Sequence, residues 1–156
     1  MHANAADIPI ADLHRAAGRP EVVAAVRTFH AETDALVAAH HAICRNRGDC
    51  CRFARFGHRL YVTAIEVAYY LATGPIPSGA SDDVCPHARD GACHARDRRF
   101  TGCRIFYCDP AARPWQGPLT EERLARLRRL HDELAVPYFY ADWMTVLQAL
   151  REAEIR

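Results

Sequence analysis

Two stretches of the first half of the chain predict helices, the first because its apolar residues recur every three to four positions and the second because of the signals at its two ends. The first stretch covers residues 20–43, and the proline at its start suits the first turn of a helix. The second covers residues 63–71, where Thr63 and Glu66 have the Thr-x-x-Glu spacing of a capping box and a Gly-Pro pair follows the last apolar residue. We therefore expect two helices in this half.

The same spacing returns in residues 120–153, which predict a helical hairpin. Thr120 is expected to cap the first helix of this hairpin, and Pro137 is expected to begin the second. Residues 1–18 are rich in alanine and have weak periodicity, so they predict a loose arm or a short docking helix.

Two segments between these helices, residues 44–59 and 84–109, lack helical periodicity and are rich in cysteine. Because a segment without an apolar face cannot take its shape from a core, we expect a bound metal to organise these loops. The chain of 156 residues shows no internal repeat and fits one domain. The expected fold is a mainly α, small helical single domain, residues 1–156, with two long cysteine-rich loops around a metal centre.

All the cysteines fall within residues 44–108, the cysteine-cluster region, and they are Cys44, Cys50, Cys51, Cys85, Cys93, Cys103 and Cys108. The N-terminal residues lack the apolar core of a secretory signal, and no apolar run approaches the roughly 20 residues that cross a bilayer. We therefore expect a cytoplasmic protein without a membrane partner. In that compartment thiols stay reduced and bind metal, and an odd number of them cannot all pair within one chain.

The overall charge is nearly balanced, with 20 basic and 19 acidic residues, and every basic residue is arginine. Because uniform arginine usage reflects a GC-rich genome, we do not expect nucleic-acid binding. The cysteine-cluster region itself contains ten arginines against five aspartates and one glutamate, a formal excess of four positive charges. Such surroundings stabilise thiolates and offset the negative charge of a metal–thiolate centre.

The cysteine spacing contains no C-x-x-C pair, which argues against zinc ribbons, thioredoxin-like sites and common ferredoxins. It resembles the YkgJ-like cysteine-cluster family, whose C-x2-C-x2-C-C signature is matched by Cys44, Cys50 and Cys51, with Arg47 at the remaining position. Later blocks of the family are matched in the same order by Cys85-Pro86, by Cys93, and by Arg99 with Cys103-Arg104, where Phe100 replaces a proline. The resemblance implies a zinc- or iron-chelating domain and points to an iron–sulfur centre.

Four thiolates satisfy a tetrahedral zinc ion or a [4Fe-4S] cluster, so seven cysteines leave some to spare. The leading ligands are Cys50, Cys85, Cys93 and Cys103, while Cys44, Cys51 and Cys108 are reserve ligands or neighbouring thiols. Arg99 and Arg104 are expected to bond or neutralise the centre. Among the histidines of the region, His58, His87 and His94 are alternative ligands, with ordinary exposed histidines as the simpler interpretation.

Three functions stay open at this point. The leading prediction is an iron–sulfur protein with a [4Fe-4S] cluster that transfers electrons or activates a substrate, together with a redox or protein partner that the sequence does not identify. A structural zinc-binding interaction module is the first alternative, and a cysteine-based redox sensor is the second. Whether the chain is an enzyme is left open.

Overall fold

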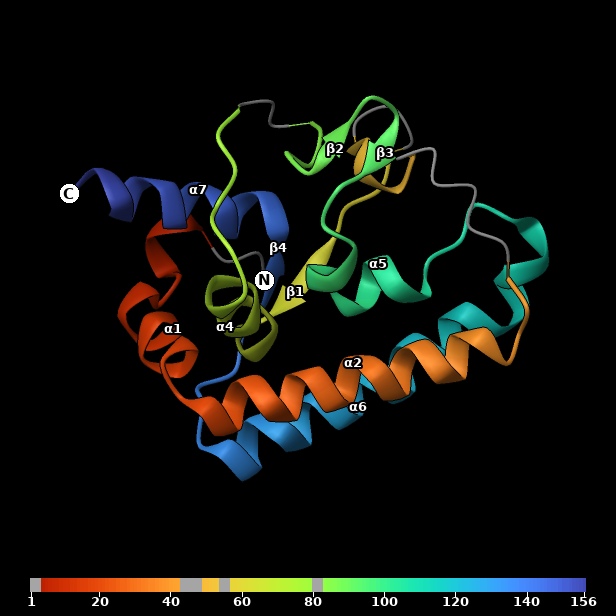
Figure 1. Cartoon of the computed structure of the whole chain (residues 1–156), viewed down its shortest axis with the longest axis horizontal. Coiled ribbons are helices and arrows are strands. Elements are labelled where there is room, and N and C mark those ends of the chain that lie inside the picture. Colours follow the sequence, from red (N-terminus) through yellow and green to blue (C-terminus); the bar gives the residue numbers. More distant parts are fainter. Residues whose placement is uncertain (1–3, 43–48, 54–56, 80–82) are drawn as a thin grey trace.

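The computed structural model describes residues 4–42, 49–53, 57–79 and 83–156 (Figure 1). Within these residues the fold is mainly helical, as expected, with six α-helices and two short antiparallel sheets. The helices are α1 (Ile10–Ala17), α2 (Pro20–Ala38), α4 (Ala64–Ala72), α5 (Thr101–Ile105), α6 (Arg113–Leu134) and α7 (Trp143–Ile155). The strands are β1 (Tyr61–Thr63), β2 (Ala88–Arg89), β3 (Ala92–Cys93) and β4 (Tyr140–Asp142). Single turns of 3-10 helix are η1 (Ala5–Asp7), η2 (Asp49–Cys51), η3 (Arg96–Arg98) and η4 (Pro110–Ala112).

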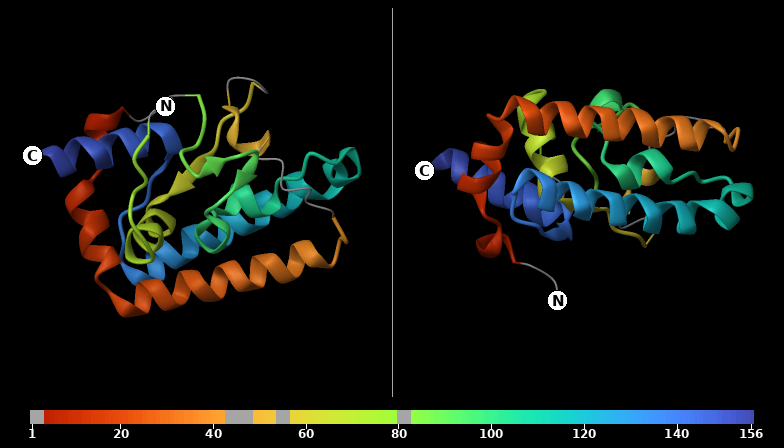
Figure 2. Two further views of the ribbon diagram at one scale, coloured as in Figure 1. Left: turned by 45° about the horizontal axis from the view of Figure 1, so that its top comes forward. Right: turned by 90° about the horizontal axis from the view of Figure 1, so that it is seen from below.

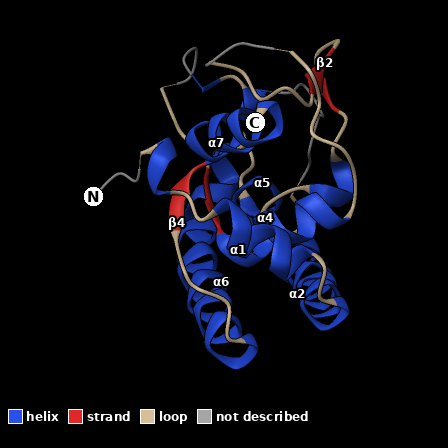
Figure 3. Cartoon of the chain, turned by 90° about the vertical axis from the view of Figure 1, so that its left-hand side faces the viewer, coloured by secondary structure: helices blue, strands red, loops and turns tan. Residues whose placement is uncertain are grey.

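The two longest helices, α2 and α6, run alongside each other, and α4 and α5 pack on them (Figures 1 and 2). Viewed end-on, α2 and α6 lie below α1 and α4 (Figure 3). Arg123 of α6 joins the two long helices, because its guanidinium donates to the Thr33 hydroxyl at 3.0 Å and lies 4.2 Å from the centre of the Phe29 ring. Both neighbours belong to α2, so this arginine holds α6 against α2.

Three aromatic rings form the centre of the main core. The Trp143 ring of α7 lies 4.9 Å from the Tyr70 ring of α4 and 4.7 Å from the Phe100 ring, which directly precedes α5. All three side chains are buried. Burial of such rings contributes several kcal/mol in total, roughly 2–3 kcal/mol each. The cluster therefore holds the C-terminal helix against the segment that leads into α5.

A two-stranded sheet starts two of the helices. β1 pairs with β4 in antiparallel register, with Val62 opposite Ala141, and each strand leads directly into a helix. The carboxylate of Asp142 caps α7 by accepting a hydrogen bond of 3.2 Å from the backbone N–H of Thr145. At the start of α4, the predicted capping box between Thr63 and Glu66 is confirmed.

The first two predicted segments differ in part from the structure. α2 begins at Pro20 as predicted but ends at Ala38, and His41 after it takes a positive φ of 54° that a continuing helix does not allow. Within residues 1–18, the described part contains the docking helix α1 rather than a loose arm. Leu13 and Ala16 of α1 are buried, and the helix packs on α4.

The structure differs in three respects from the helical hairpin predicted for residues 120–153. α6 already begins at Arg113, so Thr120 lies inside the helix and its hydroxyl donates to the Gln116 carbonyl at 2.7 Å instead of capping. Pro137 precedes β4 and does not begin a helix; α7 starts after Asp142. The two helices do not form a hairpin with each other, because α6 packs on α2 and α5 whereas α7 packs on η1, α1 and β4.

The second cysteine-rich segment, residues 84–109, contains short regular elements where only a loop was expected. β2 and β3 form a small hairpin with Ala88 opposite Cys93, and α5 follows after η3. None of the helices in the described residues combines the length and the hydropathy that crossing a membrane requires.

Candidate metal centre

Backbone hydrogen bonds bring the two cysteine-rich segments together. The N–H of Cys85 donates to the carbonyl of Cys51 at 2.9 Å, and the N–H of Phe53 donates to the carbonyl of Asp83 at 2.8 Å. Arg52 and Val84 form an antiparallel bridge between these two bonds. Segments that are more than thirty positions apart in the sequence therefore lie side by side at their cysteines.

The sulfur of Cys51 is in hydrogen-bonding contact with three other cysteines. This contact lowers the pKa of Cys50 to about 7 and that of Cys93 to about 6, and it is also the main cause of the lowered pKa of Cys85. The same three contacts raise the pKa of Cys51 itself, so this thiol keeps its proton. Because one S–H group has one proton, it donates to one neighbouring thiolate at a time. The lowered pKa values of Cys50, Cys85 and Cys93 therefore describe the group as a whole, in which the proton of Cys51 serves one thiolate at a time.

Cys103 of α5 is the fifth member of this group. Burial raises its pKa well above the usual value, and the nearby thiolates of Cys85, Cys50 and Cys93 raise it further. A thiol in this position releases its proton when a cation arrives to balance the sulfur charges. We call Cys50, Cys51, Cys85, Cys93 and Cys103 the sulfur group. The described cysteines form no disulfide with one another.

Arg99 is a positive charge close to the sulfur group. After the larger effects of hydrogen bonding and burial, its guanidinium lowers the pKa of Cys50, Cys93 and Cys103. Its Nε donates to the carbonyl of Arg96 at 3.2 Å. The predicted neutralising role of Arg99 therefore has a geometric basis.

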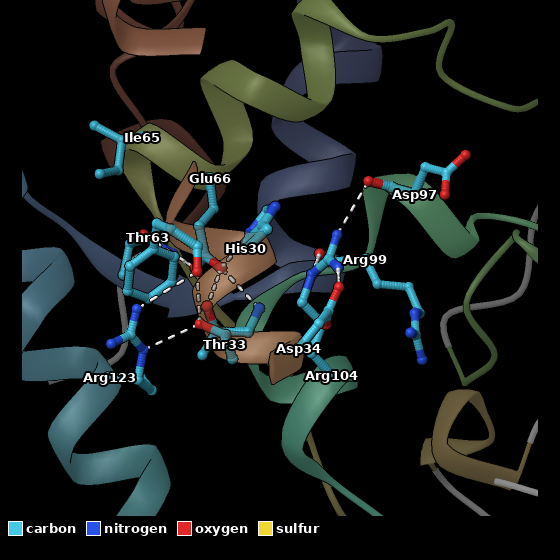
Figure 4. A network of polar contacts seen from close by, with 12 residues as sticks. His30, Thr33, Asp34, Thr63, Ile65, Glu66, Asp97, Arg99, Arg104 and Arg123 are labelled. Carbon is cyan, nitrogen blue, oxygen red and sulfur yellow. Dashed lines mark hydrogen bonds and ion pairs between the residues drawn. The ribbon is translucent and has the colours of Figure 1, made fainter. Parts of the chain in front are cut away.

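Arg104 makes its contacts elsewhere (Figure 4). Its side chain is buried and donates to Asp34 Oδ2 at 2.8 Å, to the Arg99 carbonyl at 2.8 Å and to the Asp97 carbonyl at 3.0 Å. It therefore holds the loop that carries Arg99 against α2. In this structure Arg104 positions the loop, and the predicted direct bond to a metal centre has no counterpart in these contacts.

Trp143 supplies a donor beside the sulfur group. Its indole N–H is buried and has no hydrogen-bond partner of normal geometry among the described residues. It acts on Cys85, whose pKa it lowers in addition to the larger effect of Cys51. An N–H group that faces a sulfur in a dry environment stabilises a thiolate there and tunes a metal bound to it.

The remaining predicted ligands divide into two cases. Cys44 lies outside the described residues. Cys108 is exposed in the turn after α5 and is not among the neighbours that shift the pKa of the sulfur group.

The three candidate histidines contact other groups. His58 Nε2 lies 2.9 Å from the Cys50 carbonyl, and His94 Nε2 lies 3.2 Å from the Arg89 carbonyl. His87 Nε2 lies 2.7 Å from the Tyr70 hydroxyl, and burial lowers the pKa of His87 to about 4 with the help of Arg98 and Arg89. His58 therefore borders the sulfur group through the backbone of a cysteine, and His87 is neutral at physiological pH.

Within the described residues, no group of three or more histidine, cysteine, aspartate or glutamate side chains is arranged as a ready metal site. The chemistry of the sulfur group nevertheless fits a thiophilic metal. It offers thiols with lowered pKa, an arginine that offsets their charge, and a buried indole N–H beside one sulfur. Zinc and iron–sulfur clusters both use such donors.

A buried polar network, which the sequence did not predict in full, supports α5 (Figure 4). Glu66 Oε1 accepts a hydrogen bond of 2.7 Å from the Thr101 N–H and a second bond from the Thr101 hydroxyl. The same oxygen lies 3.4 Å from His30 Nε2. Its Oε2 accepts bonds from the N–H and the hydroxyl of Thr63 at 3.3 and 3.1 Å. Burial alone would raise the pKa of Glu66, but the His30 and Thr101 contacts outweigh it and lower that pKa.

A cavity of about 330 Å³ borders the sulfur group. Cys50 and Cys103 form part of its wall. The rest comes from residues 58–60, from Glu66 of α4, from Phe106, and from β1, β4, α5 and one face of α6. Its size falls within the range of small-molecule sites, which are about 300–1,000 Å³. This cavity was not predictable from the sequence, because its walls come from distant segments that the pairing of β1 with β4 and the packing of α5 on α6 bring together.

Comparison of the chain with protein-family models, with curated proteins and with solved structures found no match. The resemblance to the YkgJ-like cysteine-cluster family thus stays a prediction from the cysteine motif.

Proposed function

We propose that this chain is a metal–thiolate protein of the iron–sulfur type, with a cluster such as [4Fe-4S] held by the sulfur group. The contact of Cys51 with Cys50, Cys85 and Cys93, which come from two distant segments, supports a metal–thiolate site of either kind. The observation that carries the iron–sulfur proposal is that Cys50 and Cys103 also line a cavity of about 330 Å³, which a closed structural zinc site does not need. Cys50, Cys85 and Cys93 have lowered pKa values and are the natural thiolate ligands. Cys51 or Cys103 would supply a fourth thiolate, and the cluster would supply a redox-active or Lewis-acidic iron.

The cavity supports substrate activation in addition to electron transfer. Cys50 and Cys103 are shared between the sulfur group and the cavity wall, so a molecule in the cavity lies directly against the metal-binding thiols. A purely electron-transferring protein needs no such space. The proposal includes the reducing cytoplasm that the sequence predicts, where these thiols stay available for metal, and a redox partner that supplies electrons.

A structural zinc site is the second candidate, and the compactness of the sulfur group favours it. Cys51 lies within hydrogen-bonding reach of three other sulfurs. Around a zinc ion with Zn–S bonds of about 2.3 Å, tetrahedral geometry places the sulfurs about 3.8 Å apart, which is a contact distance. A four-iron cluster needs its ligands to move further apart than that.

Metal and sulfide analysis of the full chain, purified without oxygen, tests the proposal. Iron and acid-labile sulfide at about four per chain, with a broad absorption near ~400 nm, would support the iron–sulfur assignment. One zinc per chain in colourless protein would replace it with the structural zinc site. Metal-free protein that undergoes reversible thiol oxidation, and that takes up neither zinc nor a cluster on reconstitution, would overturn both and leave the redox sensor. Electron paramagnetic resonance of the reduced protein then distinguishes types of cluster.

A further inference from the structure

The cavity beside the sulfur group has aromatic walls on the side of the small sheet. The Tyr61 ring of β1 and the Tyr140 ring of β4 lie 5.3 Å apart between centroids and are tilted by 36°. Both tyrosines line the cavity, and Phe106, which is 41% exposed, lines it after α5. Leu60 and Leu124 add aliphatic surface. A ligand that fits this space therefore has an apolar body and meets the faces or edges of aromatic rings.

The charged groups that line the cavity are mainly acidic. Among the described residues of the wall, Glu66 and Glu121 contribute two carboxylates, and the one arginine, Arg59, makes an ion pair of 3.4 Å with Asp142. The negative charge of the two glutamates acts on Tyr140. Burial raises the pKa of this tyrosine, and both carboxylates raise it further.

The two carboxylates have different roles. Glu66 is buried, and both of its oxygens already accept hydrogen bonds from Thr63 and Thr101. Glu121 lies on the exposed face of α6 at the rim of the cavity. Glu121 is therefore the carboxylate that a ligand meets on entry, whereas Glu66 contributes a fixed negative charge from behind.

We infer that the cavity binds a small organic cation with an apolar body, such as an alkylammonium or quaternary ammonium group. The cation lies against Tyr61 and Tyr140, whose ring faces attract positive charge, and close to the carboxylate of Glu121. An anion would meet the carboxylates of Glu66 and Glu121, and a neutral apolar molecule would gain nothing from the carboxylate of Glu121 at the rim.

The inference extends the proposed function by naming the class of molecule that lies beside the metal-binding thiols. Binding of the cation itself uses tyrosines and glutamates and requires no metal. Loss of the metal assignment would leave the cation site in place, and the two proposals can therefore fail separately.

Isothermal titration of the full chain, as purified, with choline and with its neutral isostere 3,3-dimethyl-1-butanol tests the inference. Choline should bind and the isostere should bind at least about 5-fold more weakly, because the two differ in charge and hardly in shape. Glu121→Gln should weaken choline binding by about 5-fold or more. Tyr140→Leu should weaken it as well, because it removes one ring and keeps an apolar side chain. Glu122→Gln is the matched control, since Glu122 is also exposed on α6 but does not line the cavity.

Equal binding of choline and its isostere, or no binding of either, would overturn the inference. So would equal effects of Glu121→Gln and Glu122→Gln, because a general change in surface charge would then explain the result. Since Glu121 and Glu122 are both on the surface, neither variant is expected to prevent folding. Metal content measured on the same samples shows whether any change in binding accompanies a change at the sulfur group.

Discussion

Glu66 Oε1 accepts a hydrogen bond of 2.7 Å from the backbone N–H of Thr101, and this bond joins α4 to the first turn of α5 across 35 positions of sequence. Two residues after Thr101 lies Cys103, a member of the sulfur group. The first turn of a helix has N–H groups without partners inside the helix, and Glu66 supplies an acceptor from a different helix. The placement of Cys103 therefore depends on a buried carboxylate that is itself not part of the sulfur group.

Replacing Glu66 by alanine is expected to destabilise the fold by about 3–5 kcal/mol, because several buried donors from Thr63 and Thr101 lose their acceptor at once. Urea unfolding followed by circular dichroism measures this change. Glu122→Ala, which removes an exposed glutamate of α6, should change the free energy of unfolding by less than about 0.5 kcal/mol. A loss below about 1 kcal/mol for Glu66→Ala would show that the network is not a major support of the fold.

The stability that Glu66 contributes should depend on pH. Its pKa in the folded protein lies below the usual 4.5, so the ionised carboxylate stabilises the fold at pH values above 4.5. This contribution is lost as the pH falls through the lower folded-state pKa. The difference in unfolding free energy between the wild-type chain and Glu66→Gln should therefore be largest near pH 6–7 and shrink towards about pH 3. A difference that stays constant over this range would contradict the lowered pKa.

The local part of this network was predictable and the long-range part was not. The Thr-x-x-Glu spacing of Thr63 and Glu66 predicted a capping box, and the start of α4 confirms it. A capping box depends only on residues three apart, so the sequence contains the whole signal. The bond from Glu66 to Thr101 has no local signature, because it exists only after α4 and α5 pack together.

The sulfur group shows the same division. Spacing in the sequence indicated which segments carry the cysteines, but it treated Cys51 as a reserve next to Cys50. The structure places Cys51 in contact with three other cysteines, since the single turn η2 and the backbone bond to Cys85 turn both vicinal residues inwards. The cavity was also beyond prediction, because Tyr61 and Tyr140 are neighbours only through the pairing of β1 with β4.

Cysteine substitutions should separate the sulfur group from the exposed thiol. Cys93→Ala and Cys103→Ala are each expected to lower the metal bound per chain by half or more, because each removes a sulfur that lies among the others. Cys108→Ala is the matched control and should retain metal, since Cys108 is exposed outside the group. The measurement is metal and sulfide per chain after purification without oxygen. Equal metal content in all three variants would remove the sulfur group as the binding site.

The alanine variants of Arg104 and Arg99 should have different defects: the first should lose folding stability, and the second should release metal faster. Arg104→Ala removes a buried guanidinium that pairs with the half-exposed Asp34 and donates to two carbonyls, and should lower the free energy of unfolding by about 2–4 kcal/mol. Arg104→Lys should not restore this stability, because one ammonium group cannot reach acceptors that a planar guanidinium reaches together. Urea unfolding of the two variants measures both effects.

Arg99→Ala should leave the free energy of unfolding within about 0.5 kcal/mol of the wild-type value, because the hydrogen bond that its side chain makes within the described residues is to the nearby Arg96 carbonyl. It should instead release metal to a chelator faster, since the charge that favours the thiolates of Cys50 and Cys93 is gone. Release rates measured on natively folded protein test this point. If Arg99→Ala releases metal at the wild-type rate while Arg104→Ala releases it faster, the arginines act only through the shape of the loop, and Arg99 has no electrostatic part in holding the metal.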